Sequence, residues 1–357
     1  MNSSSRLGCG AALVLTMCGA TFGQTTDSIS ELLQSHQLDL TTNGKAFLLN
    51  EASRASFMLV GGLHGDQETP ALVQALTAGA EPFGYQHLAV EMSPWAASRL
   101  EASLNRQTGP AVRIRGADIE EPQPHLLIRD LAAVNPQNHA LQSMVEITQS
   151  GYRRASAAQL LQLARQIGEF KDVSAGGFSL YALIIRTLEV ESTRANNQRL
   201  EASVRRETFM KELFISHYRA ATQGPTKPKF VVAFGQSHLG RGIDRRGVST
   251  LGNFIAELAV AEGVQSFHVV LFAAGGKYSL GGLHDIDQRK DELAFAFVAS
   301  LARYPAAVFD LRPIRQSLHN IPAPLTPRDA SLLYWADSYD AIICYREVTP
   351  LGATPPK

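Results

Sequence analysis

Cysteine is scarce in this chain of 357 residues, which contains only three. Cys9 and Cys18 lie within the first 23 residues, which have the pattern of a cleaved N-terminal segment described below. Cys344 would be the one cysteine left after such cleavage. A single cysteine excludes an internal disulfide framework. Cys344 lies in the apolar run Ala341–Tyr345, which predicts a buried, unreactive thiol rather than a nucleophile.

Excess charge and long apolar runs are lacking as well. Lys and Arg total 33, and Asp and Glu total 33, so the formal net charge is zero. This balance excludes the basic footprint of a nucleic-acid binder, and we expect no nucleic-acid partner. After the N-terminal segment no apolar run approaches the ~20 residues that a transmembrane helix needs. We therefore expect no integral membrane segment in the mature chain.

The motifs of several catalytic classes are missing. The sequence contains no G-x-S-x-G nucleophile elbow, no H-E-x-x-H zinc helix and no P-loop. No G-x-G-x-x-G follows a strand-like run either. Serine hydrolases with that elbow, zinc proteases of the HExxH type and the common nucleotide-binding enzymes are therefore disfavoured.

The first residues have the layout of a secretory signal peptide. Arg6 supplies a positive charge, residues 7–18 are mostly apolar, and small residues precede a polar stretch. We expect a signal peptide over residues 1–23, cleaved after Ala20 or Gly23, and a periplasmic or secreted protein. The residues before Cys18 loosely match a bacterial lipobox, so a lipid anchor at Cys18 is the alternative.

The rest of the chain alternates apolar runs with amphipathic stretches, which is typical of β-α units around a parallel sheet. We predict one α/β domain over residues 24–357, with a mostly parallel central sheet flanked by helices. A helical insertion or lid is expected over about 116–190. The predicted strands cover residues 57–60, 87–90, 111–115, 230–234, 267–273, 307–309 and 341–345. The predicted helices cover residues 69–80, 94–105, 155–170, 190–222 and 251–261.

Three predicted strands end in residues that can carry chemistry. Residues 57–60 lead into Gly61-Gly62-Leu63-His64, residues 87–90 lead directly into Glu91, and residues 230–234 lead into Gly235-Gln236-Ser237-His238. Ligands of open α/β sheets bind outside the carboxyl ends of the strands. The sequence therefore predicts an active centre built from His64, Glu91 and His238.

Other polar residues near these positions are secondary candidates. Glu68 and Asp66 could each take part in the site and contact substrate. Alternatively, their negative charges could stabilise the N-terminus of the helix predicted over residues 69–80. Arg206 and Arg241 could each bind an anionic group of a substrate, or each could form an ordinary ion pair. His284, which follows Gly281-Gly282-Leu283, is held in reserve.

Several stretches resemble motifs of the superfamily that comprises the erythromycin-esterase-like, ChaN-like and Tiki/TraB proteins. Residues 59–68 (LVGGLHGDQE) resemble its first motif, and residues 88–91 (LAVE) resemble its second strand and acid. Residues 206–210 (RETFM) are similar to its arginine–methionine helix, and residues 230–241 to its later histidine motif. The resemblance extends over about residues 45–350, with gaps through the predicted insertion.

The resemblance implies a hydrolase that cleaves an ester or related acyl bond in a small-molecule or peptide substrate. His64 would activate water, Glu91 would orient or assist it, and His238 would hold or polarise the substrate carbonyl. One position departs from the pattern, because the family has an acid directly after the first glycine of its first motif, where this chain has Gly62. Glu68 is the nearest carboxylate that could replace it.

Two other functions remain open. Two histidines and a carboxylate suit a divalent transition metal, so His64, Glu91 and His238 could be the metal ligands of a Tiki/TraB-like peptidase. The ChaN-like branch implies a non-enzymatic protein that binds haem or another ligand. The cofactor would then be a divalent metal in the first case and haem in the second.

Overall fold

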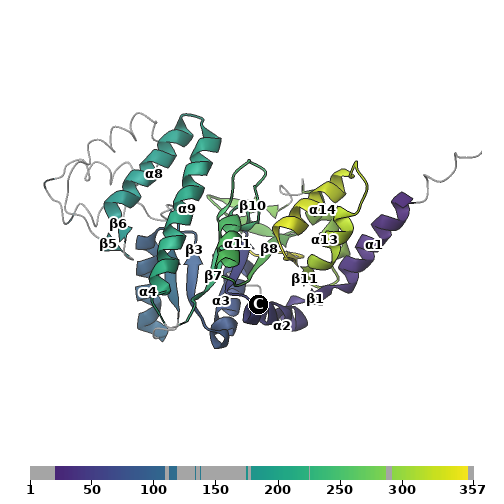
Figure 1. Ribbon diagram of the computed structural model, residues 1–357, viewed down its shortest axis with the longest axis horizontal. Helices are drawn as coiled ribbons and strands as arrows, with labels where there is room; N and C mark the ends of the chain where they lie inside the picture. The colour runs from purple at the N-terminus through teal and green to yellow at the C-terminus, as the bar shows by residue number, and fades with distance from the viewer. Residues whose placement is uncertain are drawn as a thin grey trace, which may run out of the picture.

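The computed structural model describes residues 21–108, 112–118, 174–175, 178–224, 226–286 and 292–352, with the single residues 133 and 137. Its centre is a sheet of eight strands in the order β1-β11-β12-β8-β2-β7-β3-β4. The strands from β12 to β4 are parallel, whereas β11 is antiparallel to both β12 and β1. The prediction of a mostly parallel α/β sheet is therefore confirmed (Figure 1).

The bounds of the sheet strands agree closely with the apolar runs of the sequence. In chain order they are β1 Gln37–Asp39, β2 Phe57–Gly62, β3 Tyr85–Val90, β4 Arg113–Gly116, β7 Lys229–Gly235, β8 Ser266–Ala273, β11 Ala306–Asp310 and β12 Ala341–Tyr345. Two short pairs lie outside this sheet, formed by β5 Ser174–Ala175 with β6 Phe178–Ser179 and by β9 Lys277–Ser279 with β10 Leu283–Asp285.

Helices cover both faces of the sheet, because alternate residues of each strand point to opposite faces. Phe57 and Leu59 of β2 pack into one apolar cluster, and Met58 and Val60 pack into the other. The first cluster is covered by α1 Thr21–Ser35, α8 Leu180–Ala195, α9 Arg199–Ala221, α11 Leu251–Ala261, α12 Leu293–Leu301, α13 Arg312–His319 and α14 Pro327–Ser338. The second is covered by α2 Lys45–Arg54 and α3 Glu68–Ala80.

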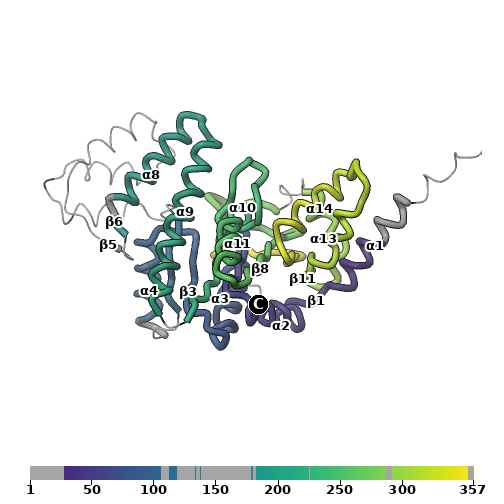
Figure 2. Tube along the Cα trace, viewed as in Figure 1, coloured from purple at the N-terminus to yellow at the C-terminus, as the bar shows by residue number. Residues whose placement is uncertain are grey.

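The two ends of the sheet carry different helices. Figure 1 shows α8 and α9 side by side near β3. The helix α4 Pro94–Thr108 packs against β4. The trace in Figure 2 shows the described end of α1 beside α13, although the two are far apart in the sequence. The short helix α10 Gln236–Leu239 follows β7 directly and contacts β2.

Side-chain caps explain where several helices begin. Ser93 accepts a hydrogen bond from the backbone N–H of Ala96 at the start of α4. Thr250 accepts one from Asn253 at the start of α11. These oxygens satisfy N–H groups that have no partner within the helix. The local sequence, through Ser93 and Thr250, thus determines where α4 and α11 begin.

The prediction of one long helix over residues 190–222 is wrong. The structure has α8 and α9 in its place, separated by Asn196, Asn197 and Gln198. Asn197 has a φ of 60°, and asparagine adopts this left-handed conformation more readily than most residues. The predicted helix over residues 155–170, most of the expected insertion and the predicted signal region before residue 21 lie outside the described residues.

Two smaller expectations can be compared with the structure. Cys344 is buried, and burial raises the pKa of its thiol to about 12, so the thiol is unreactive as expected. Within the described ranges, no helix has both the length and the apolar character needed to cross a membrane.

Candidate functional site

The carboxyl ends of four neighbouring strands meet at one site. His64 follows β2, Gly235 ends β7, Glu91 follows β3 directly, and Asp118 lies two residues beyond β4. These strands are consecutive in the sheet, and β7 lies between β2 and β3 although it comes much later in the sequence. The chain order therefore reverses beside β2, and such reversals are where open α/β sheets bind ligands.

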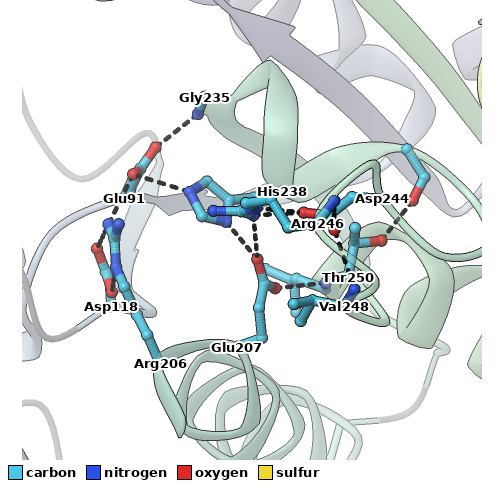
Figure 3. A network of polar contacts seen from close by, with 12 residues as sticks. Glu91, Asp118, Arg206, Glu207, Gly235, His238, Asp244, Arg246, Val248 and Thr250 are labelled. Atoms are coloured by element: carbon cyan, nitrogen blue, oxygen red, sulfur yellow. Dashed lines mark hydrogen bonds and ion pairs between the residues drawn. The ribbon is translucent and has the colours of Figure 1, made fainter. Parts of the chain in front are cut away.

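Glu91 contacts the other main residues of the site, and Figure 3 shows its contacts with Gly235, His238 and Arg206. Its Oε2 accepts a hydrogen bond of 2.5 Å from the backbone N–H of Gly235 and lies 3.6 Å from His64 Nε2. Its Oε1 accepts a hydrogen bond of 2.8 Å from Arg206 and lies 3.5 Å from His238 Nε2. The Glu91 side chain is only 10% exposed. A carboxylate so far removed from water needs such partners to remain ionised.

Arg206 connects Glu91 to a second buried carboxylate. Its Nε lies 3.1 Å from Asp118 Oδ1, and its Nη2 lies 2.5 Å from Asp118 Oδ2. The Asp118 side chain is fully buried. Arg206 lies on α9, so this helix is tied to the ends of β3 and β4 by charged hydrogen bonds, which are stronger than neutral ones.

His238 lies between two carboxylates. Its Nδ1 is 2.5 Å from Glu207 Oε1, and its Nε2 faces Glu91. Burial by itself would lower the pKa of His238, but the hydrogen bond and charge of Glu207, together with the charge of Glu91, outweigh burial and raise the pKa above its ordinary value. These contacts thus favour the protonated form of His238 over the neutral one.

His64 differs from His238 in its access to solvent. Its side chain is 50% exposed, whereas that of His238 is 6% exposed. Gly235 makes room for it, because a Cβ at position 235 would lie 2.4 Å from His64 Nε2 and 3.2 Å from Glu91 Oε2. Of the two histidines, His64 is therefore the one that a substrate and a water molecule can reach.

Four of the predicted residues come together, and two make other contacts. His64, Glu91, His238 and Arg206 form the site described above. Glu68 instead accepts hydrogen bonds of 2.9 and 3.1 Å from the backbone N–H of Thr349. The guanidinium of Arg241 bonds both oxygens of Asp340. These contacts support a structural role for Glu68 and Arg241 rather than a role in substrate binding.

Neighbours of the first motif also have structural contacts. Asp66 caps α3 through the backbone N–H and hydroxyl of Thr69. His284 lies on the β9–β10 hairpin, where its Nε2 contacts the carbonyl of Leu280. A Cβ at Gly62 would lie 2.3 Å from the methyl carbon of Thr69, so an acid at position 62 could not fit without displacing this capped residue.

Sequence reasoning missed Asp118 and Glu207. Asp118 lies two residues beyond the end of β4, so the search for acids near strand ends that found Glu91 could also have identified it. Glu207 is 1% exposed although it lies on a helix, and its second oxygen accepts the backbone N–H of Leu251. Its position directly after Arg206 was the available signal, because buried acids require partners.

The arrangement does not fit a metal centre. Among the described residues, no group of three or more His, Cys, Asp or Glu side chains is placed to hold one metal ion. Arg206 and the Gly235 N–H occupy oxygens that Glu91 would offer, and both ring nitrogens of His238 face carboxylates. A metal bound by His64, Glu91 and His238 would have to displace these contacts.

Comparisons with known proteins agree on the fold. No protein-family model and no curated protein matches this sequence. Three solved structures match with TM-scores of 0.52–0.56 and cover 90–91% of this chain. A Bacillus cereus protein is 15% identical, with 98% of its own length covered, and a succinoglycan biosynthesis protein is 13% identical, with 97% covered.

The third structure is a histidine-to-asparagine variant of the erythromycin esterase EreC in its open conformation. It is 14% identical to this chain, with 98% of its length covered and a TM-score of 0.52. At these identities the likeness concerns the fold. The chain therefore has an erythromycin-esterase-like fold, as the sequence motifs implied.

Proposed function

We propose that this protein is an exported hydrolase that cleaves an ester or related acyl bond with a water molecule activated by His64. The observation that carries the proposal is the pairing of a half-exposed imidazole with a buried, firmly held carboxylate, His64 with Glu91. The similarity in fold to a protein named erythromycin esterase supports ester chemistry. The signal-like N-terminus supports export.

His64 is the general base in this mechanism. Its Nε2 faces Glu91, so the proton on that nitrogen points to the carboxylate and Nδ1 is left unprotonated to accept a proton from water. The separation of 3.6 Å exceeds a hydrogen bond, and such contacts often shorten when substrate binds. Water then adds to the acyl carbon, and His64 returns the proton to the leaving alcohol, which yields an acid and an alcohol.

Glu91 orients His64 and balances the positive charge that His64 gains. Arg206 and the Gly235 N–H hold the carboxylate in place from two directions. His238 adds a third contact to Glu91, and both of its ring nitrogens face carboxylates. The family resemblance implied that His238 holds or polarises the substrate carbonyl. In this arrangement His238 acts instead by holding Glu91.

The test is a panel of chromogenic and macrolide esters assayed with the mature protein and with His64→Ala. General acid–base catalysis contributes about 100- to 10,000-fold, so we expect His64→Ala to lose at least ~100-fold in kcat/KM. His319→Ala is the matched control, because His319 is 55% exposed and pairs with Asp337 on the surface. A His64→Ala protein that hydrolyses the panel as fast as the wild type would refute the proposal.

The same preparations decide between this function and the alternatives. Because the site does not fit a metal, we expect hydrolysis to continue after treatment with a chelator. Activity that disappears with EDTA and returns with one divalent metal would favour the metallopeptidase. A haem absorption band that depends on His64, in a protein without hydrolytic activity, would favour the haem-binding reading, because His64 is the accessible histidine of the pair.

A further inference from the structure

Glu207 has more contacts than a residue that only stabilises a helix requires. Its Oε1 lies 2.5 Å from His238 Nδ1 and 3.8 Å from a guanidinium nitrogen of Arg246. Its Oε2 accepts a hydrogen bond of 2.9 Å from the backbone N–H of Leu251 at the start of α11. The side chain thus joins α9 to the segment after β7 and to α11 (Figure 3).

The position of His238 between Glu207 and Glu91 decides its protonation. A neutral imidazole has one N–H donor and one acceptor nitrogen, so one ring nitrogen would present a lone pair to a carboxylate. Two lone pairs facing each other repel, whereas a doubly protonated imidazolium donates one N–H to Glu207 and directs the other toward Glu91, at an ion-pair separation of 3.5 Å. The geometry therefore favours the charged form of His238.

A protonated His238 places a positive charge between two buried carboxylates, those of Glu91 and Glu207. Arg206 also contacts Glu91, and Arg246, which is 43% exposed, contacts both Glu207 and Asp244. The cationic form of His238 therefore adds to the compensation of two buried carboxylates, and buried charges without compensation are costly.

We propose that Glu207 is a positioning residue that holds His238 as a doubly protonated cation against Glu91. The consequence for hydrolysis rests on the proposed function: His238 and Arg206 together hold the Glu91 carboxylate in place beside His64. Glu207 itself contacts no reacting atom. Its effect passes through His238 and Glu91, across the separation of 3.5 Å between His238 Nε2 and Glu91 Oε1.

The first test requires no substrate. NMR of the imidazole nitrogens reports how many protons each ring carries, and His238→Gln assigns the signal. In the wild type we expect His238 to stay doubly protonated through neutral pH. In Glu207→Gln the amide can neither accept as strongly nor compensate the charge, so His238 should become neutral. A His238 signal that stays doubly protonated in Glu207→Gln would overturn the proposal.

Kinetics provide the second test. Partners that orient metal-bound histidines contribute about 10- to 100-fold, and by analogy we expect kcat to fall by about that factor in Glu207→Gln. We expect KM to change little and the basic limb of the pH–rate profile to move to lower pH. Glu212→Gln is the matched control, since Glu212 lies on the same helix and is 52% exposed.

Glu207→Asp separates positioning from folding. Aspartate keeps the charge on a shorter side chain, so it should retain the imidazolium signal and recover part of kcat. If Glu207→Gln is folded and has wild-type kcat and a wild-type pH profile, Glu207 only joins the helices and the proposal fails. If instead His64→Ala hydrolyses as well as the wild type, the proposed function fails, and the NMR result still decides the link between Glu207 and His238.

Discussion

Gly235 offers the sharpest test of the geometry around His64. The substitution Gly235→Ala adds one methyl group whose carbon would lie 2.4 Å from His64 Nε2. Non-bonded atoms pack at about 3.5 Å, so the imidazole must move by about 1 Å. The backbone tolerates the change, because Gly235 has φ −57° and ψ 144°, which alanine adopts freely. Alanine also keeps the N–H that Glu91 accepts.

This perturbation should separate activity from stability. A displacement of about 1 Å in a catalytic group can reduce the rate by about 100-fold, which corresponds to about 2.7 kcal/mol in the activation free energy. His64 is half exposed and can swing toward solvent, so we expect the melting temperature of Gly235→Ala to change by only a few degrees, in line with a cost of about 1 kcal/mol or less.

The assay compares kcat/KM and thermal unfolding in the wild type, Gly235→Ala and Gly224→Ala. Gly224 is the control, since a Cβ there would meet only the carbonyl of Ala221 at 3.6 Å, an ordinary contact. If Gly235→Ala keeps full activity while His64→Ala is inactive, the contact between His64 and Glu91 does not govern catalysis. If Gly235→Ala unfolds at a much lower temperature, the assumption that only His64 moves is wrong.

Three further predictions concern stability and the assignment of secondary residues. Arg206→Met should lower the free energy of unfolding by about 3–5 kcal/mol in urea denaturation, because it breaks the buried ion pairs of Arg206 with Asp118 and Glu91. The exposed pair of Arg205 with Glu201 should contribute only about 1 kcal/mol or less. Burial lowers the pKa of His268 to about 3, so as the pH falls below about 6.5 the unfolded chain binds a proton that the folded chain does not. On account of this histidine, the free energy of unfolding should fall by up to about 1.4 kcal/mol for each pH unit below that point. Urea denaturation at several pH values between about 7 and 4 should show a shallower fall in His268→Gln than in the wild type. Equal slopes of unfolding free energy against pH in the two proteins would contradict the lowered pKa of His268. Glu68→Gln should leave KM and kcat within about twofold of the wild type, since Glu68 contacts the backbone of Thr349, and a large rise in KM would restore its role in substrate binding.

Much of the fold could be predicted because its signals are local. Strands buried on both faces are continuous apolar runs, so β2, β7, β8 and β12 are visible in the sequence. Helix starts such as that of α11 depend on side chains a few residues away. The boundary between α8 and α9 was missed, because no proline or glycine marks it and the break lies in the backbone conformation of Asn196, Asn197 and Gln198.

The candidate site was predictable in part for the same reason. His64, Glu91 and His238 each follow a strand-like run, and parallel strands present their carboxyl ends at one edge of the sheet. The carboxylate that each arginine bonds was not predictable. Arg206 and Arg241 are equivalent candidates in the sequence, yet one bonds Glu91 and the other bonds Asp340. Glu91 follows β3, whereas Asp340 precedes β12, so the choice depends on which strand end lies beside each arginine.

The sequence by itself determined the α/β fold and the three residues at the strand ends, because apolar patterns and residue types carry that information directly. Only the tertiary structure decided that β7 lies between β2 and β3, and this places Gly235 and His238 against Glu91. It also decided that Asp118 and Glu207 join the network and that Glu68 does not. Hydrogen bonds and charge pairs depend on distances between segments that are remote in the chain, and those distances exist only once the sheet has formed.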